Sequence, residues 1–111
     1  LAELNPKKVD AENFSDLLQG TIENAPVIDE TMSPFLDRKI EGLDQTELAI
    51  LRISIYELMY RPDIPYKVII NEALELAKKF GSIEGYKYIN GVLDKIAHSS
   101  KISTIRQTPK T

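Results

Sequence analysis

The stretch from residue 44 to residue 65 constrains the fold most, because it predicts a helix that is apolar on nearly every side. Asp44 offers a side-chain cap and Glu47 follows three positions later, an arrangement typical of a helix N-terminus. Pro62 and Pro65 end the segment, since each proline removes a backbone donor and biases its predecessor toward extended geometry. The polar positions expected to face water are Glu47, Arg52, Ser54 and Glu57. A helix of this kind must be covered by neighbours on several sides, which predicts a bundle around it.

The rest of the 111-residue chain repeats the helical pattern. Prolines, glycines and capping residues divide it into about five blocks with apolar residues at three- and four-residue steps, and none alternates with the period of two expected of a half-buried strand. The fold class is therefore predicted to be all-α. The blocks outside the central helix predict helices over residues 11–24, 26–32, 65–80 and 86–97. A break at Pro34 and a short turn through Phe35 and Leu36 are expected after the second.

The last two predicted helices carry further expectations. The buried stripe of the helix over 65–80 is predicted to comprise Ile69, Ala73, Leu76, Ala77 and Phe80. Gly81 is expected as a left-handed residue after this helix, and Gly81 to Gly85 as the turn to the next. Gly91 would cost about 1 kcal/mol relative to alanine, so we expect another helix to cross close to it. From His98 onward no apolar period is sustained, which predicts a disordered tail over residues 98–111.

Composition and motifs argue against several classes of protein. The net charge of −3 and the absence of cysteine exclude a uniformly basic nucleic-acid binder, a disulfide framework and a cysteine-ligated zinc site, and they fit a cytoplasmic setting. No apolar run is long enough to span a membrane. His98 is the only imidazole and lies at the end of the last predicted helix, while Glu72 and Glu75 fit a solvated face. We therefore predict no catalytic residue, no metal site and no cofactor.

Basic and aromatic residues gather around one predicted turn. Lys78 and Lys79 end one helix, whereas Tyr86, Lys87 and Tyr88 open the next. Cations for phosphates and flat rings for unpaired bases are the combination that recognises single-stranded RNA. The alternative is that Tyr88 packs in the core and the lysines only solubilise the surface, and residue types alone favour this alternative.

Three longer stretches resemble a known family. They are LDQTELAILRISIYEL at 43–58, DIPYKVIINEA with ELAKKFG within 63–81, and KYINGVLDKIA at 87–97. Together they closely resemble the NusB family of bacterial transcription antitermination factors, over about residues 1 to 97. The resemblance implies an all-α, non-enzymatic protein of seven helices in two small subdomains, of which about five helices are expected in this chain. Residues 1–25 would then be a remnant of the N-terminal helical subdomain, residues 26–97 the C-terminal helical subdomain, and residues 98–111 the tail.

The resemblance also implies partners and a binding surface. Family members pair with NusE, a ribosomal small-subunit protein, and the pair binds the boxA element of ribosomal RNA leaders, acting with other Nus factors to keep RNA polymerase elongating. The residues expected to face RNA are Lys87, Tyr88 and Glu84 from the resemblance, with Tyr86, Lys78 and Lys79 from the basic and aromatic pattern. The residues expected to meet NusE are Glu47 and Phe35. The family more often has Phe where this chain has Tyr88, an exchange that stacking tolerates.

One departure from the family affects both binding and packing. Family members begin with a further Arg-rich segment, which this sequence does not contain. Since those cations supply much of the attraction to phosphates, we expect an isolated copy of this chain to bind RNA weakly. We also expect apolar side chains of the first helix to lack packing partners, namely Phe14, Leu17, Leu18 and Ile22.

Two other classes of protein remain as alternatives. A NusB-like domain also occurs at the N-terminus of certain ribosomal RNA cytosine methyltransferases, although this sequence ends without a glycine-rich cofactor loop or a catalytic cysteine. A purely structural module, or a homodimer formed through the apolar face near the N-terminus, is the other alternative.

Overall fold

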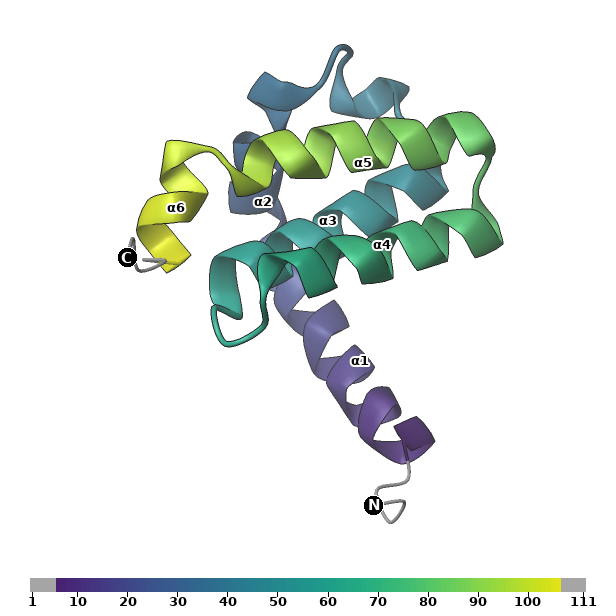
Figure 1. Ribbon diagram of the computed structural model, residues 1–111, viewed down its shortest axis with the longest axis vertical. Helices are drawn as coiled ribbons and strands as arrows, with labels where there is room; N and C mark the ends of the chain where they lie inside the picture. Colours follow the sequence, from purple (N-terminus) through teal and green to yellow (C-terminus); the bar gives the residue numbers. More distant parts are fainter. Residues whose placement is uncertain (1–5, 107–111) are drawn as a thin grey trace.

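Every regular element is helical in residues 6–106, the part of the chain that the computed structural model describes; side chains are described from residue 15 onward. The helices are α1 (Pro6–Glu23), α2 (Ala25–Met32), α3 (Gln45–Tyr60), α4 (Tyr66–Phe80), α5 (Ile83–Ala97) and α6 (Ser100–Arg106). Two short 3-10 turns, η1 (Ser33–Phe35) and η2 (Ile40–Gly42), connect α2 to α3. The predicted all-α fold class is confirmed, and α3 lies between α4, α5 and the remaining helices (Figure 1).

The central helix α3 begins at the predicted cap and occupies the core. Oδ2 of Asp44 accepts hydrogen bonds from the backbone N–H groups of Thr46 (2.9 Å) and Glu47 (3.3 Å). The helix packs against α1, α2, α4, α5 and α6, so its all-round apolar surface is covered as predicted. Its fully buried side chains are Leu51, Ile55 and Leu58. This packing makes α3 the frame against which the other helices are positioned.

Two of the polar positions on α3 do not face water, contrary to the expectation. Ser54 is buried because its hydroxyl donates to the Ile50 carbonyl oxygen (2.8 Å), which satisfies it inside the bundle. Glu57 is also buried, at the side of α3 that faces Glu72 of α4. Arg52 is half-buried and reaches α2, where its Nε and a terminal nitrogen each bond a carboxylate oxygen of Asp29 (2.9 and 2.7 Å). Burial on all sides therefore extends even to polar side chains of this helix.

The connection from α4 to α5 is shorter than predicted. α5 begins at Ile83 and not near Tyr86, because the Ser82 hydroxyl caps it by accepting from the Gly85 N–H (2.9 Å). Gly81 is extended, with φ −121°, and not left-handed. Phe80 is 67% exposed and does not join the buried stripe of α4, whereas Ile69, Ala73 and Ala77 do. Phe80 is the last residue of α4, and Leu76 of the predicted stripe is half-buried.

The prediction that another helix crosses close to Gly91 is wrong. A Cβ atom on Gly91 would meet nothing within 4 Å. The close approaches occur at Gly20, where a Cβ would overlap the ring of Tyr56, and at Gly85, where a Cβ would lie 2.5 Å from Oε2 of Glu47. Gly20 brings α1 onto α3, and Gly85 brings the first turn of α5 onto the first turn of α3.

The prediction of a disordered tail from residue 98 onward is wrong within the described residues, because Ser100–Arg106 form α6. The Ser99 hydroxyl accepts weakly from the N–H of Ile102 (3.4 Å), and Ile102 is fully buried. The guanidinium of Arg106 donates to the backbone oxygens of Leu58 (3.0 Å) and Ile64. A single apolar anchor shows no period in a sequence, which is why the pattern of apolar residues did not predict α6. Residues 107–111 lie outside the described part.

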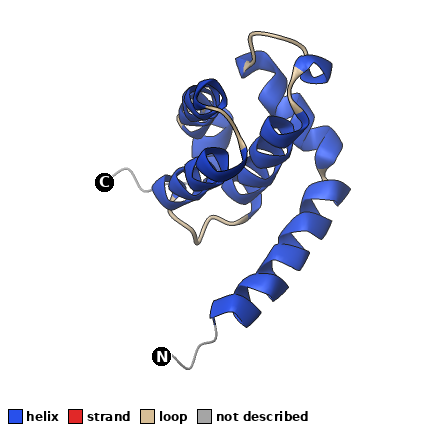
Figure 2. Ribbon diagram, turned by 90° about the vertical axis from the view of Figure 1, so that its right-hand side faces the viewer, coloured by secondary structure: helices blue, strands red, loops and turns tan. Residues whose placement is uncertain are grey.

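Helix α1 extends away from the other helices and contacts them mainly at its C-terminal end (Figures 1 and 2). Leu18 is 39% exposed and Ile22 is 65% exposed, in line with the expectation that apolar side chains here lack partners. Leu17 is half-buried, and the side chain of Phe14 is outside the described set. The division into subdomains at residue 25 stays a prediction.

Candidate nucleic-acid interface

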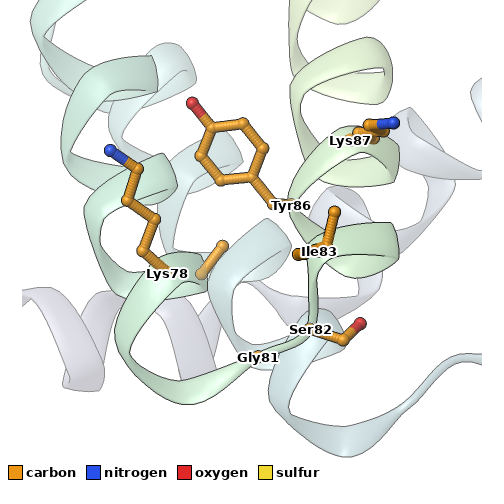
Figure 3. A pocket seen from close by; sticks show the side chains of 7 residues that line it. Lys78, Gly81, Ser82, Ile83, Tyr86 and Lys87 are labelled. Atoms are coloured by element: carbon orange, nitrogen blue, oxygen red, sulfur yellow. The ribbon is translucent and has the colours of Figure 1, made fainter.

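The turn between α4 and α5 forms one side of an open groove of about 460 Å³. The residues that line it are Ala77, Lys78, Gly81, Ser82, Ile83, Tyr86 and Lys87. Nζ of Lys78 lies 5.8 Å from the centroid of the Tyr86 ring, within the range of a cation–π interaction. These two side chains lie side by side, whereas Lys87 projects from the other flank of α5 (Figure 3). We call this feature the α4–α5 groove.

Apolar side chains at the rim make the groove unusual for a surface turn. Ile83 is 75% exposed and Phe80, just before the turn, is 67% exposed. Tyr86 is half-buried and packs against the core cluster. The groove therefore combines apolar contact area with the ammonium group of Lys78, and it has room for a flat ring.

Tyr88 lies elsewhere, against the segment that connects α2 to α3. Its hydroxyl donates to Oδ1 of Asp37 (3.0 Å) and accepts from the Asp37 N–H (3.4 Å). The guanidinium carbon of Arg38 lies 4.7 Å from the centroid of the Tyr88 ring, and Nε of Arg38 bonds Oδ1 of Asp37 (2.7 Å). We call these three residues the Tyr88 cluster. Tyr88 is half-buried at the edge of the core, so it has both a packing role and an exposed polar end.

The charges of the Tyr88 cluster are fixed by their contacts. Hydrogen bonds from Arg38 and Tyr88 lower the pKa of the Asp37 carboxyl, so it is anionic at neutral pH. Burial raises the pKa of Tyr88, so its hydroxyl stays a neutral donor. The hydrogen bond to Asp37 raises the pKa of Arg38. The cluster is thus a neutral phenol beside an ion pair, with the cation over its ring.

The structure divides the six residues predicted to face RNA between these two features. Lys78 and Tyr86 lie together in the α4–α5 groove, and Lys79 is exposed beside Lys78 without lining it. Glu84 and Lys87 are exposed on the first two turns of α5. Tyr88 belongs to the second feature. The two rings of α5 therefore face different neighbours, although they are two positions apart in sequence.

The two residues predicted to meet NusE lie on the side of Tyr88. Phe35 is half-buried in η1, which packs against α5. Glu47 is half-buried, and its carboxylate approaches Gly85 in the first turn of α5. A carboxylate at a helix N-terminus is favoured by the helix dipole, which explains why α5 tolerates it there.

Sequence reasoning missed Asp37 and Arg38. The only signal was their position in a charged loop after Pro34. They are far in sequence from Tyr88, 51 residues in the case of Asp37, so no local pattern places them beside that ring. They are brought there by the packing of η1 on α5.

Two further searches concern other kinds of site. Within the described residues, no three potential metal-ligating side chains of His, Cys, Asp or Glu come together. Among the helices of residues 6–106, none has the length and apolar character needed to cross a membrane.

The fold and this surface define a small helical protein with a mixed cationic and aromatic face. Comparison with known proteins makes the class specific. The model of the NusB family matches residues 1–98, and the chain belongs to that family. Helix α6 lies beyond the matched residues.

Relatives named transcription antitermination protein NusB, which is not the name of an enzyme, support the same assignment. The protein of Mannheimia succiniciproducens is 57% identical over 91 residues, which are 82% of this chain and 64% of the relative. The protein of Alcanivorax borkumensis is 52% identical over 97 residues, or 87% of this chain and 65% of the relative. That of Serratia proteamaculans is 52% identical over 99 residues, or 89% and 72%. The chain thus spans just under two thirds of the length of the first two relatives.

Proposed function

We propose that this chain is the RNA- and protein-binding part of a transcription antitermination factor. It would bind boxA RNA of ribosomal RNA leaders together with NusE, and act in the cytoplasm with other Nus factors to keep RNA polymerase elongating. The observation that carries the proposal is the match of residues 1–98 to the NusB family. The proposed activity is binding alone, with no bond made or broken.

The first half of α5 and the end of α4 are the proposed RNA-binding surface. Lys78, Lys79 and Lys87 are exposed cations that can neutralise phosphates. Tyr86 offers a ring at the α4–α5 groove, on which an unpaired base can stack. The exposed carboxylate of Glu84 can accept hydrogen bonds from base amino groups or a ribose 2′-hydroxyl. The surface can therefore contact both the backbone and the bases of a single strand.

The proposed NusE-binding surface lies on the other flank of α5, around Phe35 and Glu47. Phe35 provides a partly exposed ring in η1, and Glu47 a partly exposed carboxylate on α3. The Tyr88 cluster joins the segment after η1, which carries Phe35, to α5, which carries Glu84 and Lys87. RNA and NusE would therefore bind as neighbours, which would allow each to increase the affinity for the other.

The proposal is tested by the affinity for a fluorescently labelled single-stranded boxA RNA, measured by anisotropy with and without NusE. The affinity is expected to fall as the salt concentration rises. The slope of log K against log salt should be about −0.7 for each phosphate contacted. An RNA of scrambled sequence is the control. Absent binding, or binding that does not depend on salt, would contradict the proposal.

The two tyrosines of α5 give a sharper version of the test. Tyr86→Ala and Tyr88→Ala should each weaken RNA binding by about 1–3 kcal/mol if the rings support stacked bases. Tyr60→Ala is the matched control, because Tyr60 is exposed at the C-terminal end of α3, which precedes the start of α4, whereas the α4–α5 groove lies at the end of α4. Thermal unfolding of each variant separates a loss of binding from a loss of folding. If Tyr88→Ala unfolds the protein and Tyr86→Ala binds normally, neither ring supports RNA.

A further inference from the structure

The Tyr88 cluster has a feature that a lone tyrosine lacks, which is a cation fixed over its ring. Arg38 is held on two sides, by the Tyr88 ring at 4.7 Å and by Oδ1 and Oδ2 of Asp37 at 2.7 and 3.3 Å. Asp37 is itself held by the Tyr88 hydroxyl at 3.0 Å. The three side chains therefore form a closed set of contacts, although the Arg38 side chain is still 48% exposed.

This arrangement changes which group can meet a base. Arg38 covers one face of the Tyr88 ring, and burial of Tyr88 at the core edge limits access to the remainder. A guanidinium is flat, and bases stack on its plane as they do on aromatic rings. We propose that an unpaired RNA base stacks on the outer face of Arg38, which Asp37 and Tyr88 hold in place. This inference rests on the proposed RNA binding and assigns it a further residue.

The surrounding charges favour a base over a phosphate at this position. A hollow of about 320 Å³ beside the cluster is lined by Ser33, Arg38, Lys39, Ile40 and Glu41. Lys39 and Arg38 are there opposed by Glu41 and by Asp37, so the cations are balanced by nearby carboxylates. A phosphate would gain little net attraction in such a set. A stacked base needs no net charge, and a pre-positioned arginine loses little side-chain freedom when it binds.

Arg38→Ala and Arg38→Lys separate stacking from charge. We expect Arg38→Ala to weaken binding of single-stranded boxA RNA about thirtyfold, the middle of the range for loss of one base stack. Arg38→Lys should lose nearly as much, because lysine keeps the charge and lacks the flat face. The salt dependence of wild type and Arg38→Lys should be the same. Lys67→Ala is the control, because it removes one exposed positive charge at the far end of α4 and should leave both the affinity and its salt dependence unchanged.

The direction in which Asp37→Asn changes the RNA affinity tests whether Asp37 is a positioning residue. If Asp37 holds Arg38 for stacking, the variant should bind the RNA two- to fivefold more weakly, in about the range expected for a partly lost stack. If Asp37 only competes with RNA for the guanidinium, the same change should tighten binding, and the inference is then wrong. Tyr88→Phe keeps the ring under Arg38 but removes the hydroxyl that holds Asp37, so it should weaken RNA binding by no more than Asp37→Asn does.

A direct readout comes from 2-aminopurine placed at successive positions of the same RNA. One position should show quenched fluorescence with wild type and recover with Arg38→Ala and Arg38→Lys, while all variants keep wild-type thermal unfolding. Full binding by Arg38→Lys, with loss only in Arg38→Ala, would mean that charge and not stacking is recognised. RNA binding by wild type that neither Arg38 variant changes would overturn the inference and leave the proposed function standing. Wild type that does not bind the RNA would instead refute the proposed function.

Discussion

Helices α1 and α6 lie at the two ends of the described chain and are attached in opposite ways (Figure 1). α1 has 18 residues, but it extends away from the bundle and leaves Leu18 and Ile22 exposed. α6 has seven residues, yet it buries Ile102 completely. It also bonds distant segments, through Arg106 to carbonyls of residues 58 and 64 and through Lys101 to the Thr31 hydroxyl (2.8 Å).

The difference shows that forming a helix and being anchored to the core are separate properties. An apolar period predicts the first, because it requires only that one face can be buried. Anchoring depends on whether a space in the core receives a side chain and whether the polar groups nearby are satisfied. α6 meets both conditions with one isoleucine and one arginine, whereas α1 relies on a narrow contact with α3 at Gly20.

Among the variants that test this comparison, Ile102→Ala is expected to change the free energy of unfolding most. Removing a fully buried isoleucine side chain leaves a cavity, so the free energy of unfolding should fall by about 2–4 kcal/mol in chemical denaturation. Ile105→Ala is the matched control on the same helix, because Ile105 is 37% exposed, and it should cost less than about 1 kcal/mol. Equal effects of the two variants would mean that α6 is not anchored through Ile102.

Gly20→Ala tests the contact of α1 in the same way. A Cβ atom at this position would overlap the Tyr56 ring, so the change should destabilise the protein by about 1–3 kcal/mol. Gly91→Ala is the control, since a Cβ there meets nothing within 4 Å, and it should stabilise the protein by about 0.5–1 kcal/mol. A neutral Gly20→Ala would show that α1 does not pack on α3 in solution.

Features set by neighbouring residues were predictable from the sequence. The all-α class, the Asp44 cap and the burial of α3 follow from local pattern, and the structure contains all three. The buried residues of α4 at 69, 73 and 77 follow from the same helical period. The basic and aromatic residues at the turn between α4 and α5 were also found, because they are close in sequence.

Features set by distant residues were not predictable. Gly85 and Gly91 look alike in the sequence, and only the approach of Glu47 gives the first a reason. Arg38 comes to lie over Tyr88 through packing of η1 on α5, which no spacing indicates. Residue types predict Tyr88 to be either in the core or facing RNA, whereas it is half-buried and bonded to Asp37. Long-range packing therefore decides the candidate site in a way that residue types alone do not.

The end of α3 next to α6 also predicts a pH dependence. The pKa of Glu57 is raised from 4.5 to about 7, chiefly by burial and also by the negative charge of Glu72, while Arg61 opposes the shift. Since the folded state binds this proton more tightly than the unfolded state, its stabilising effect is present below pH 4.5 and is lost as the pH rises through about 7. Glu57→Gln should therefore be more stable than wild type at pH 8, by on the order of 1 kcal/mol, and should lose this advantage at pH 4.

The control for this pH effect is Glu72→Gln, which removes the neighbouring negative charge and should shift the pH dependence of wild type to lower pH. The measurement is the free energy of unfolding in urea at pH 4, 6 and 8. Unchanged stability of Glu57→Gln relative to wild type across that range would show that Glu57 is solvated in solution.

Ile22→Ser should have the smallest effect, and it tests whether the exposed face of α1 is bare in solution. Ile22 is 65% exposed, and isoleucine and serine have similar helix propensities, so the free energy of unfolding should change by less than about 0.5 kcal/mol. Ile28→Ser in the adjacent α2, where the side chain is fully buried, should be far more destabilising. If Ile22→Ser costs more than about 1 kcal/mol, and the cost grows with protein concentration, another copy covers this face. Light scattering would then show a dimer, and the weak attachment of α1 would hold only for the monomer.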